Sequence, residues 1–495
     1  MHIKQTSFLM MFALFLCAVS VTNAQQKPNT KPNVLFIAVD DLRTEFGAYG
    51  SKYIHAPNLD RLAKQGVTFT RAYVQQAVCS PSRSSFLTGT RPDTTKVWDL
   101  VTHFRTALPD VVTLPQLFKN NGYFVQGMGK LYHGGYDDPQ SWSVPWGTPK
   151  AVTYGLPENE ARQKASQQAR RQQQEGGGNE DGTRGPAFEG ADVPDNTFQD
   201  GKVAELAIKT LREMAKKDQP FWLGVGFIKP HLPFVAPKKY WDLYDPAKIQ
   251  LAPNPFRAKD APEYAVQPGG ELRNYQDIPK GPIPDDLARQ LKHGYYEAIS
   301  YTDAQLGKLL DELDRLKLRD NTIIVLLGDH GWKLGEHGAW CKHTNVENDT
   351  HAPLLISAPG LKTAGSSNAA LVEFVDIYPT LAELCGLSLP KHLEGTSLVP
   401  LLSNKVKAVK TAAFSQYHRV SNKQKLMGYT MRTERYRFTR WVHRDDHSKV
   451  DSIELYDEQT DPQENVNIAK DPKNAALVAK LTDEWMKGWQ GAKVK

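Results

Sequence analysis

The chain contains few cysteines and, after its N-terminal segment, no long apolar run. Four cysteines occur among 495 residues, too few for the disulfide framework that stabilises small secreted domains. Cys341 and Cys385 could pair in an oxidising compartment, but we expect both to remain thiols. Because no later stretch is long and apolar enough to cross a bilayer, we expect no membrane span.

Neither sign of charge is in large excess. There are 61 lysines and arginines and 55 acidic residues, which gives a formal net charge of +6. The sequence has neither a long basic helix nor zinc-finger spacing, so we expect no nucleic-acid partner. A modest positive balance is compatible with a polyanionic substrate.

The first 24 residues have the pattern of a secretory signal. Lys4 precedes an apolar run over 8–21, and a small-x-small site ends at Ala24. The apolar run is short for a membrane span. We therefore predict cleavage after Ala24, loss of Cys17 with the signal, and a secreted or periplasmic protein.

Apolar strands alternate with helices along most of the chain. This alternation predicts an α/β fold with a doubly wound, mostly parallel sheet flanked by helices. The predicted strands cover 33–39, 67–74, 123–128, 220–227, 321–328 and 353–358. The predicted helices cover 57–65, 114–121, 202–217, 285–317 with a break near Ser300, and 376–385.

Two segments interrupt this alternation, and a different pattern follows it. We interpret 158–190 as a surface insertion with a polar helix in its first half, and 236–284 as a long ordered loop that lines a substrate cleft. Short strands near 412–417, 426–432 and 436–441, followed by a helix over 475–489, predict a smaller subdomain with an antiparallel sheet. We therefore divide the mature chain into a catalytic domain, 25–403, and a C-terminal subdomain, 404–495.

Polar side chains follow four of the predicted strands. Because the carboxyl ends of parallel strands meet at one edge of a sheet, we expect these side chains to lie close together. Adjacent carboxylates repel each other, so a site that holds them together usually binds a cation. The strand-end residues are Asp40 and Asp41, Lys130 and His133, Lys229 and His231, and Asp329 and His330.

A cysteine precedes a predicted helix in the segment Cys79-Ser80-Pro81-Ser82-Arg83. Pro81 suits the first position of a helix because it lacks an N–H and its φ is preset. Cys79 is then at or just before the helix N-terminus, where backbone N–H groups favour anions. Arg83, one turn later, adds a positive charge on the same side, so a nucleophile, an anion-binding helix end and an arginine converge.

These motifs resemble those of the type I sulfatases, which depend on formylglycine. Cys-x-Pro-x-Arg at 79–83 with Thr-Gly-x-Arg at 88–91, Asp-Asp at 40–41, Gly-Lys-x-x-His at 129–133, Lys-Pro-His at 229–231 and Asp-His-Gly-Trp at 329–332 stand in sulfatase order. The iduronate-2-sulfatase-like branch is the most similar. It shares Arg-Pro-Asp-Thr-Thr at 91–95 and Gly-Glu-His-Gly at 335–338 followed by Lys342. The resemblance implies the alkaline-phosphatase-like fold.

The resemblance also implies the chemistry. A formylglycine-generating or anaerobic sulfatase-maturating enzyme would oxidise Cys79, and the hydrated gem-diol, stabilised by Arg83, would attack the sulfur of a sulfate ester. Lys130, His231 and Lys342 would hold the sulfate, with His231 protonating the leaving oxygen and His133 acting as the base. Trp332 would bind substrate.

One divalent cation, expected to be Ca²⁺, would be bound by Asp40, Asp41, Cys79, Asp329 and His330. Imidazole is an unusual calcium ligand, and most sulfatases carry Asn where this chain has His330, but the iduronate branch has His.

The resemblance implies that the substrate is a sulfated oligosaccharide. The first hypothesis is removal of the 2-O-sulfate from a terminal uronic acid. Two alternatives use nearly the same site, namely desulfation of an algal polysaccharide such as ulvan and hydrolysis of phosphonate or phosphate esters. A glycan-binding protein without activity would lack a nucleophile or a metal ligand, and neither is missing here.

Overall fold

The computed structural model describes residues 31–176, 184–267 and 270–494. The predicted signal segment, 1–24, lies outside the described residues. Among the described residues, no helix combines the length and the apolar character that a membrane span requires. Three buried cysteines, Cys79, Cys341 and Cys385, are described, and they form no disulfide with one another.

The central element is a mixed sheet with the strand order β10-β2-β9-β8-β1-β6-β4. β1 is parallel to both β6 and β8, β4 is parallel to β6, and β10 is parallel to β2. β9 is antiparallel to its neighbours β2 and β8. These strands are β1 (Asn33–Val39), β2 (Val67–Phe69), β4 (Phe124–Gly129), β6 (Phe221–Phe227), β8 (Thr322–Gly328), β9 (Leu354–Ser357) and β10 (Ser366–Asn368). The prediction of a mostly parallel sheet is confirmed.

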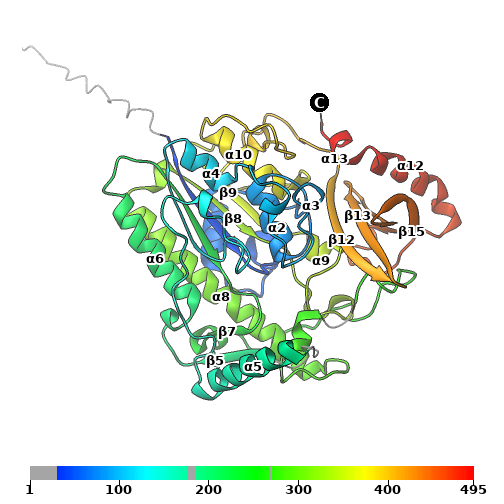
Figure 1. Cartoon of the computed structure of the whole chain (residues 1–495), viewed down its shortest axis with the longest axis horizontal. Helices are drawn as coiled ribbons and strands as arrows, with labels where there is room; N and C mark the ends of the chain where they lie inside the picture. Colours follow the sequence, from blue (N-terminus) through cyan, green and yellow to red (C-terminus); the bar gives the residue numbers. More distant parts are fainter. Residues whose placement is uncertain (1–30, 177–183, 268–269, 495) are drawn as a thin grey trace, which may run out of the picture. The chain divides into compact units, whose positions relative to one another are not determined.

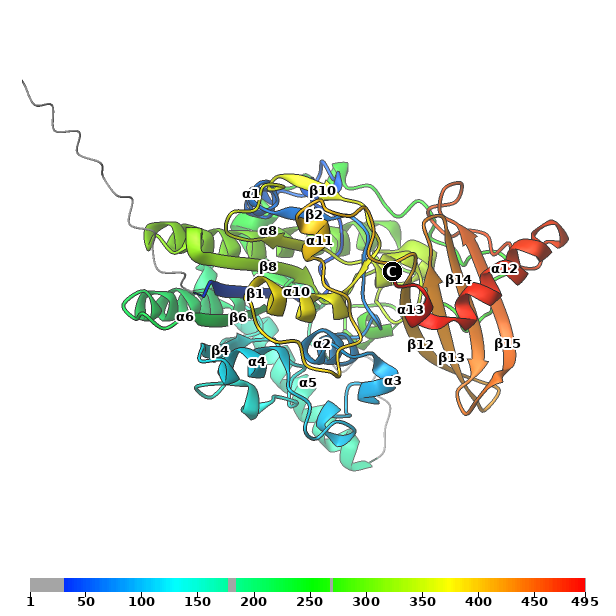
Figure 2. The same ribbon diagram turned by 90° about the horizontal axis from the view of Figure 1, so that it is seen from above.

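Both faces of the sheet are covered by helices, because alternate residues of each strand point to opposite faces. In β1, Leu35, Ile37 and Val39 pack in one hydrophobic cluster, and Val34, Phe36 and Ala38 pack in another. Figures 1 and 2 show the helices of the two layers. The first cluster includes α1 (Pro57–Gln65), α6 (Gln199–Met214) and α8 (Asp285–Arg315), and the second includes α2 (Cys79–Thr88), α4 (Leu114–Asn120) and α10 (Ile377–Leu384). The fold is therefore the predicted doubly wound α/β arrangement.

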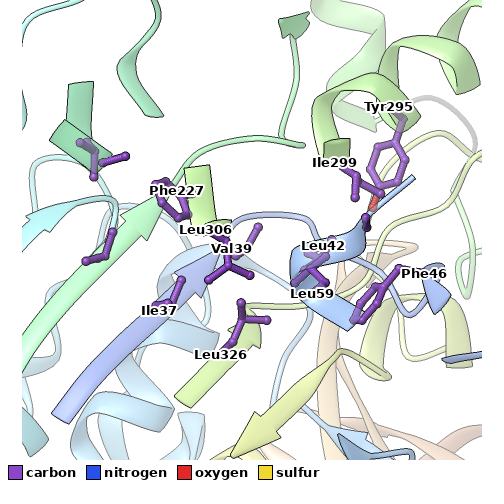
Figure 3. Close-up of a cluster of buried hydrophobic side chains, with 14 of the residues drawn as sticks. Ile37, Val39, Leu42, Phe46, Leu59, Phe227, Tyr295, Ile299, Leu306 and Leu326 are labelled. Carbon is purple, nitrogen blue, oxygen red and sulfur yellow. The ribbon is translucent and has the colours of Figure 1, made fainter. Parts of the chain in front are cut away.

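The core fixes the backbone at the carboxyl end of β1. Figure 3 shows Val39 and Leu42 packed among apolar side chains of the neighbouring strands and of α8. From α8, the hydroxyl of Tyr295 donates a hydrogen bond to the Asp41 carbonyl at 2.6 Å. The two acidic residues after β1 are thus attached to a rigid, fully buried support.

A second, antiparallel sheet with a terminal helix confirms the smaller C-terminal element (Figure 2). It has a fourth strand that the sequence did not reveal, because the first half of β15 is mostly exposed and polar. The strands are β12 (Ala413–Ser421), β13 (Gln424–Arg432), β14 (Tyr436–His443) and β15 (Asp446–Asp457), and the helices are α12 (Ala475–Met486) and α13 (Gly488–Gly491). The described residues from Pro32 onward form one compact unit. The boundary after residue 403 stays a prediction.

Two expectations about single elements were wrong. α8 runs through Ser300 without the predicted break, because the Ser300 hydroxyl bonds to the His55 carbonyl at 2.7 Å instead of competing for its own helix backbone. The predicted strand over 67–74 is split, and its second part, β3 (Ala72–Tyr73), leaves the central sheet to pair with β11 (Val372–Glu373).

The two interrupting segments carry more regular structure than expected. The insertion begins with the predicted polar helix, α5 (Pro157–Gly176), and ends with β5 (Phe188–Ala191), which pairs with β7 (Phe234–Pro237). Residues 177–183 lie outside the described part. The segment 236–284 contains α7 (Lys238–Trp241) and the short 3-10 helices η5 (Pro246–Lys248) and η6 (Gly270–Asn274).

Candidate active site

The ends of β1 and β8 bring the acidic residues together. The Asp41 N–H donates to Asp329 Oδ1 at 3.0 Å. Asp41 has a φ of 60°, in the left-handed region that is unfavourable for a residue with a Cβ. Its hydrogen bonds to Asp329 and Tyr295 hold that conformation. Strain maintained in this way is typical of a functional site.

Cys79 is the first residue of α2 and lies against these carboxylates, as predicted. Its Sγ is 3.4 Å from Asp40 Oδ1 and 3.3 Å from His330 Nε2. One ligand atom each of Asp40, Asp41, Cys79 and His330 lies within 4.8 Å of the others. The fifth predicted ligand, Asp329, is adjacent, with its Oδ1 3.6 Å from His330 Nε2.

The donor set fits a divalent cation. Asp40 and Asp41 are completely buried, and Asp41 Oδ1 accepts no well-aligned hydrogen bond, although Lys342 Nζ lies 3.1 Å from it. Buried carboxylate oxygens without donors are costly unless a cation compensates them. Carboxylates suit a hard ion such as calcium, while the imidazole ligand is less typical of it.

Residue 79 is a cysteine in this structure, so its sulfur marks the place of the oxygens that formylglycine would carry. Burial, and after it the charge of Asp40, raises the pKa of the Cys79 thiol well above its usual value, although Lys130 opposes the shift. A protonated, buried thiol is a poor nucleophile. The unmodified side chain is therefore unsuited to attack on its own.

Arg83 compensates the negative charge of two buried carboxylates, Asp40 and Asp329. The side chain is completely buried, its Nε donates to Asp329 Oδ2 at 2.8 Å, and one terminal nitrogen lies 3.4 Å from Asp40 Oδ1. Another nitrogen donates to the carbonyls of Lys130 and Leu131. Arg83 therefore holds the acidic pair against the end of β4, one helical turn after Cys79.

Two lysines supply positive charge beside Cys79. Lys130 Nζ donates to Asp40 and lies 3.7 Å from Cys79 Sγ, and Lys342 Nζ lies 3.1 Å from Asp41 Oδ1. Burial disfavours the charged form of both lysines, but the neighbouring negative charges together outweigh it and raise each pKa, with Asp40 the strongest of them for Lys130 and Asp41 for Lys342. Both side chains are ammonium ions that can hold an anion.

His231 and Glu271 complete the polar cluster. His231 Nε2 is 3.2 Å from Glu271 Oε1 and 3.9 Å from Asp41 Oδ2, and Glu271 Oε2 accepts from Lys342 Nζ at 2.8 Å. Sequence reasoning missed Glu271. The only signal was its place in the 236–284 segment, since no motif surrounds it.

Two other predicted site residues lie outside this cluster: His133 lines a cavity, and Trp332 is fully buried. Burial, with Lys130 next in importance, lowers the pKa of His133 to about 4, and its Nδ1 has no hydrogen-bond partner. The imidazole is therefore neutral and has a nitrogen free to accept a proton, although the lowered pKa makes it a weak base. Trp332 is fully buried, with Lys342 Nζ 4.8 Å from the centre of its ring. It supports Lys342, and its predicted contact with substrate stays a prediction.

A cavity of about 500 Å³ opens beside Lys130, His133 and His231. Its remaining walls come mainly from residues 146–153, 198–200 and 228–233 and include Trp146 and Phe198. Such a combination of apolar walls and a few convergent polar groups is typical of small-ligand sites. The sequence had not indicated 146–153 as a wall.

Comparison with known proteins shows the family to which the chain belongs. The family model named Sulfatase matches residues 32–387, and the model named N-sulphoglucosamine sulphohydrolase, C-terminal, matches residues 335–490. Iduronate 2-sulfatase of Mus musculus is 34% identical over 97% of this chain and 98% of its own length. The Homo sapiens protein of the same name is 35% identical over 90% of this chain and 92% of its own length.

A solved structure described as a 2-O GAG sulfatase has the same fold. It superposes with a TM-score of 0.71 at 22% sequence identity and covers 93% of each chain. The family match extends over most of the described chain and includes the strand ends that carry the acidic residues, Cys79 and the histidines. The chain therefore belongs to the sulfatase family, whose members are sulfuric ester hydrolases.

Proposed function

We propose that this sulfatase removes a sulfate ester from a sulfated polysaccharide, specifically the 2-O-sulfate of a uronic acid at a chain end. The observation that carries the proposal is the group of Lys130, His231 and Lys342: Lys130 lies beside Cys79, and the other two lie beside Asp41 in the same cluster. Lys130 and His231 also line the adjoining cavity. The similarity to iduronate 2-sulfatases over nearly the whole chain favours the uronate among sulfated sugars.

Two groups would be added to this chain before it is active. Asp40, Asp41, His330 and residue 79, with Asp329 beside them, would hold one divalent cation, expected to be calcium. The formylglycine made from Cys79 would supply the oxygen nucleophile, and the cation would polarise it and offset the charge of the sulfate. The cluster of buried ligand atoms around Asp41 supports the cation, and the protonated Cys79 thiol is consistent with a precursor.

The protein's own side chains have separable tasks. Lys130 and Lys342 would hold the sulfate oxygens where negative charge develops. His231 would give its Nε2 proton to the sugar oxygen as the ester S–O bond breaks, so that an alcohol leaves. His133, neutral and with a free Nδ1, would accept the proton whose removal releases the sulfate. Arg83 would keep the carboxylates in place.

The proposed function also requires that the protein is exported and that Cys79 is converted to formylglycine. The N-terminal pattern supports removal of residues 1–24, and the Cys-x-Pro-x-Arg segment supports recognition by a formylglycine-generating or anaerobic maturating enzyme. Mass spectrometry of the purified protein should find an N-terminus at Gln25 and an aldehyde in the peptide that contains residue 79. A residue 79 that remains a thiol in fully active protein would contradict the nucleophile assignment.

A substrate panel tests the activity directly. We expect sulfate release from a disaccharide with a 2-O-sulfated uronate at its non-reducing end, and little release from the same sulfate inside a longer chain. Equal rates on internal sulfates would contradict action from the chain end. Activity confined to 6-O-sulfated hexosamine or to ulvan oligosaccharides would contradict the uronate assignment and identify a different sulfated sugar as the substrate. Preference for aryl phosphate over aryl sulfate would favour the phosphoester alternative.

The matched control for this panel is Cys79→Ala, which should be inactive on every substrate while keeping the thermal unfolding midpoint of the wild type. An active Cys79→Ala variant would exclude formylglycine chemistry. Binding of a glycan by wild-type protein without release of any sulfate would favour a carbohydrate-binding role.

A further inference from the structure

Glu271 lies between two of the cations that are proposed to act on the sulfate. Its Oε1 is 3.2 Å from His231 Nε2, and its Oε2 is 2.8 Å from Lys342 Nζ. The side chain is only 13% exposed. Burial raises its pKa, but His231 and then Lys342 outweigh burial and hold the carboxyl group well below its usual pKa. Glu271 is therefore an anion placed in direct contact with both groups.

Arg184 also forms an ion pair with Glu271. Arg184 Nη1 is 2.9 Å from Glu271 Oε1, and the backbone N–H of Arg184 donates to the Asn274 carbonyl at 2.8 Å. The guanidinium also lies 5.6 Å from the centre of the Tyr275 ring. The Glu271 carboxylate is thus held by an arginine from a distant part of the chain, whose own backbone is hydrogen-bonded to the segment that carries Glu271.

The contacts of His231 define which proton it can transfer. Nδ1 lies 2.6 Å from the Leu232 carbonyl, and Nε2 faces the Glu271 carboxylate. Carbonyl and carboxylate oxygens only accept, so each ring nitrogen donates. Nδ1 is occupied by the backbone, and Nε2 is on the side of Asp41, 3.9 Å away. Glu271 therefore fixes the orientation of the single N–H that can reach a substrate.

We propose that Glu271 is a positioning residue that orients His231 for protonation of the leaving oxygen, and that Arg184 holds Glu271 in this role. The inference rests on the proposed function. When the ester S–O bond breaks, the proton on Nε2 passes to the departing oxygen and His231 becomes neutral. During this step the hydrogen bond of Nε2 changes from Glu271 to the ester oxygen, and Glu271 keeps its contacts with Lys342 and Arg184.

The dependence on the leaving group tests this role. A sugar alkoxide is a poor leaving group that needs the proton, whereas 4-nitrophenolate leaves without it. With Glu271→Gln we expect kcat on the sugar sulfate that the wild type cleaves fastest to fall about 100-fold, the lower end of what a positioned acid contributes. On 4-nitrophenyl sulfate we expect a change of less than about threefold, because only acid catalysis is impaired.

Four further variants test whether the effect is specific to the contact between Arg184 and Glu271. Arg184→Gln should lower sugar-sulfate turnover in the same selective way, and the double variant should be no worse than Glu271→Gln alone, because Arg184 acts through Glu271. Glu271→Asp should recover part of the selective loss. Glu263→Gln is the matched control, since Glu263 is on the same segment but is almost fully exposed and pairs with Arg257.

The outcomes separate the two proposals. Equal losses on both substrates in Glu271→Gln and Arg184→Gln would show a general structural role and overturn the positioning role, as would unchanged rates on both. If Glu271→Gln does not fold, the Arg184→Gln selectivity decides in the same way. Wild-type protein that cleaves neither substrate would overturn the proposed function, and the positioning role with it.

Discussion

The ammonium group of Lys342 is buried between two carboxylates and an aromatic ring. It contacts Asp41 and Glu271 and lies over the ring of Trp332. Lys342→Ala should lower kcat/KM for sulfated substrates. The expected loss of transition-state stabilisation is about 2–4 kcal/mol, which is typical when one preorganised hydrogen-bond donor is removed. Steady-state kinetics measures the loss, and circular dichroism checks that the variant is folded. An unchanged kcat/KM would remove Lys342 from the sulfate site.

Asp41 carries a prediction about metal that does not depend on activity. Calcium added to metal-free wild type should raise the thermal unfolding midpoint, because a ligand that binds only the folded state stabilises it. Asp41→Asn should abolish this increase, since the cluster would lose one of its carboxylate ligands. The matched control is Asp218→Asn at an exposed position. A midpoint that calcium leaves unchanged in wild type would contradict the cation site.

At the scale of elements, Asp200 joins the start of α6 to the end of β6. Its carboxylate accepts hydrogen bonds from the backbone N–H groups of Ile228 and Lys229, both at 2.8 Å. Burial raises the pKa of Asp200 to about 6, although these hydrogen bonds oppose the shift. The folded protein therefore keeps this proton over a pH range in which the unfolded chain, with a pKa near 3.9, has lost it.

This difference sets the sign of a pH dependence. Between about pH 4 and pH 6 the folded state binds more protons at Asp200, so raising the pH lowers the free energy of unfolding. Asp200→Asn removes this contribution, so the variant should gain about 3 kcal/mol relative to wild type between pH 4 and pH 7.5. Urea unfolding at both pH values measures it. A pH-independent difference between the two proteins would contradict the assigned cause.

At the scale of the whole molecule, buried ion pairs attach the C-terminal sheet to the catalytic segment. Arg437 of β14 is 1% exposed and pairs with Glu347 and, at 2.5 Å, with Glu464. Glu347 begins α9 (Glu347–Thr350), which follows closely after Lys342. Arg437 also donates to the Asn345 carbonyl at 2.9 Å. The sheet and the active-site segment should therefore unfold together.

Arg437→Met tests this coupling. Removing one partner of a buried pair leaves an uncompensated charge, so we expect a loss of about 3–5 kcal/mol in the free energy of unfolding. Tryptophan fluorescence and far-ultraviolet circular dichroism should report one coincident transition in both wild type and variant. Two separate transitions, with only one shifted by the substitution, would show that the C-terminal sheet unfolds independently.

The sequence by itself determined the sheet and the convergence of the acidic residues. The six apolar residues 34–39 followed by Asp40 and Asp41 specify a buried strand and its polar end, and the strand–helix alternation places other strand ends at the same edge. Pro81 likewise indicates the start of α2 to within two residues, since the helix begins at Cys79. These are local signals, because strand period, helix capping and connection handedness depend on residues close together in the chain.

Tertiary structure alone decided the features that depend on distant partners. Glu271 has no local motif and gains its place from Arg184, His231 and Lys342, which lie far from it in sequence. α8 stays unbroken at Ser300 because the hydroxyl finds its partner at His55. The polar first half of β15 becomes a strand through pairing with β14. Long-range packing and charge pairing outweigh local propensity at these positions, and no pattern in the neighbouring residues records such contacts.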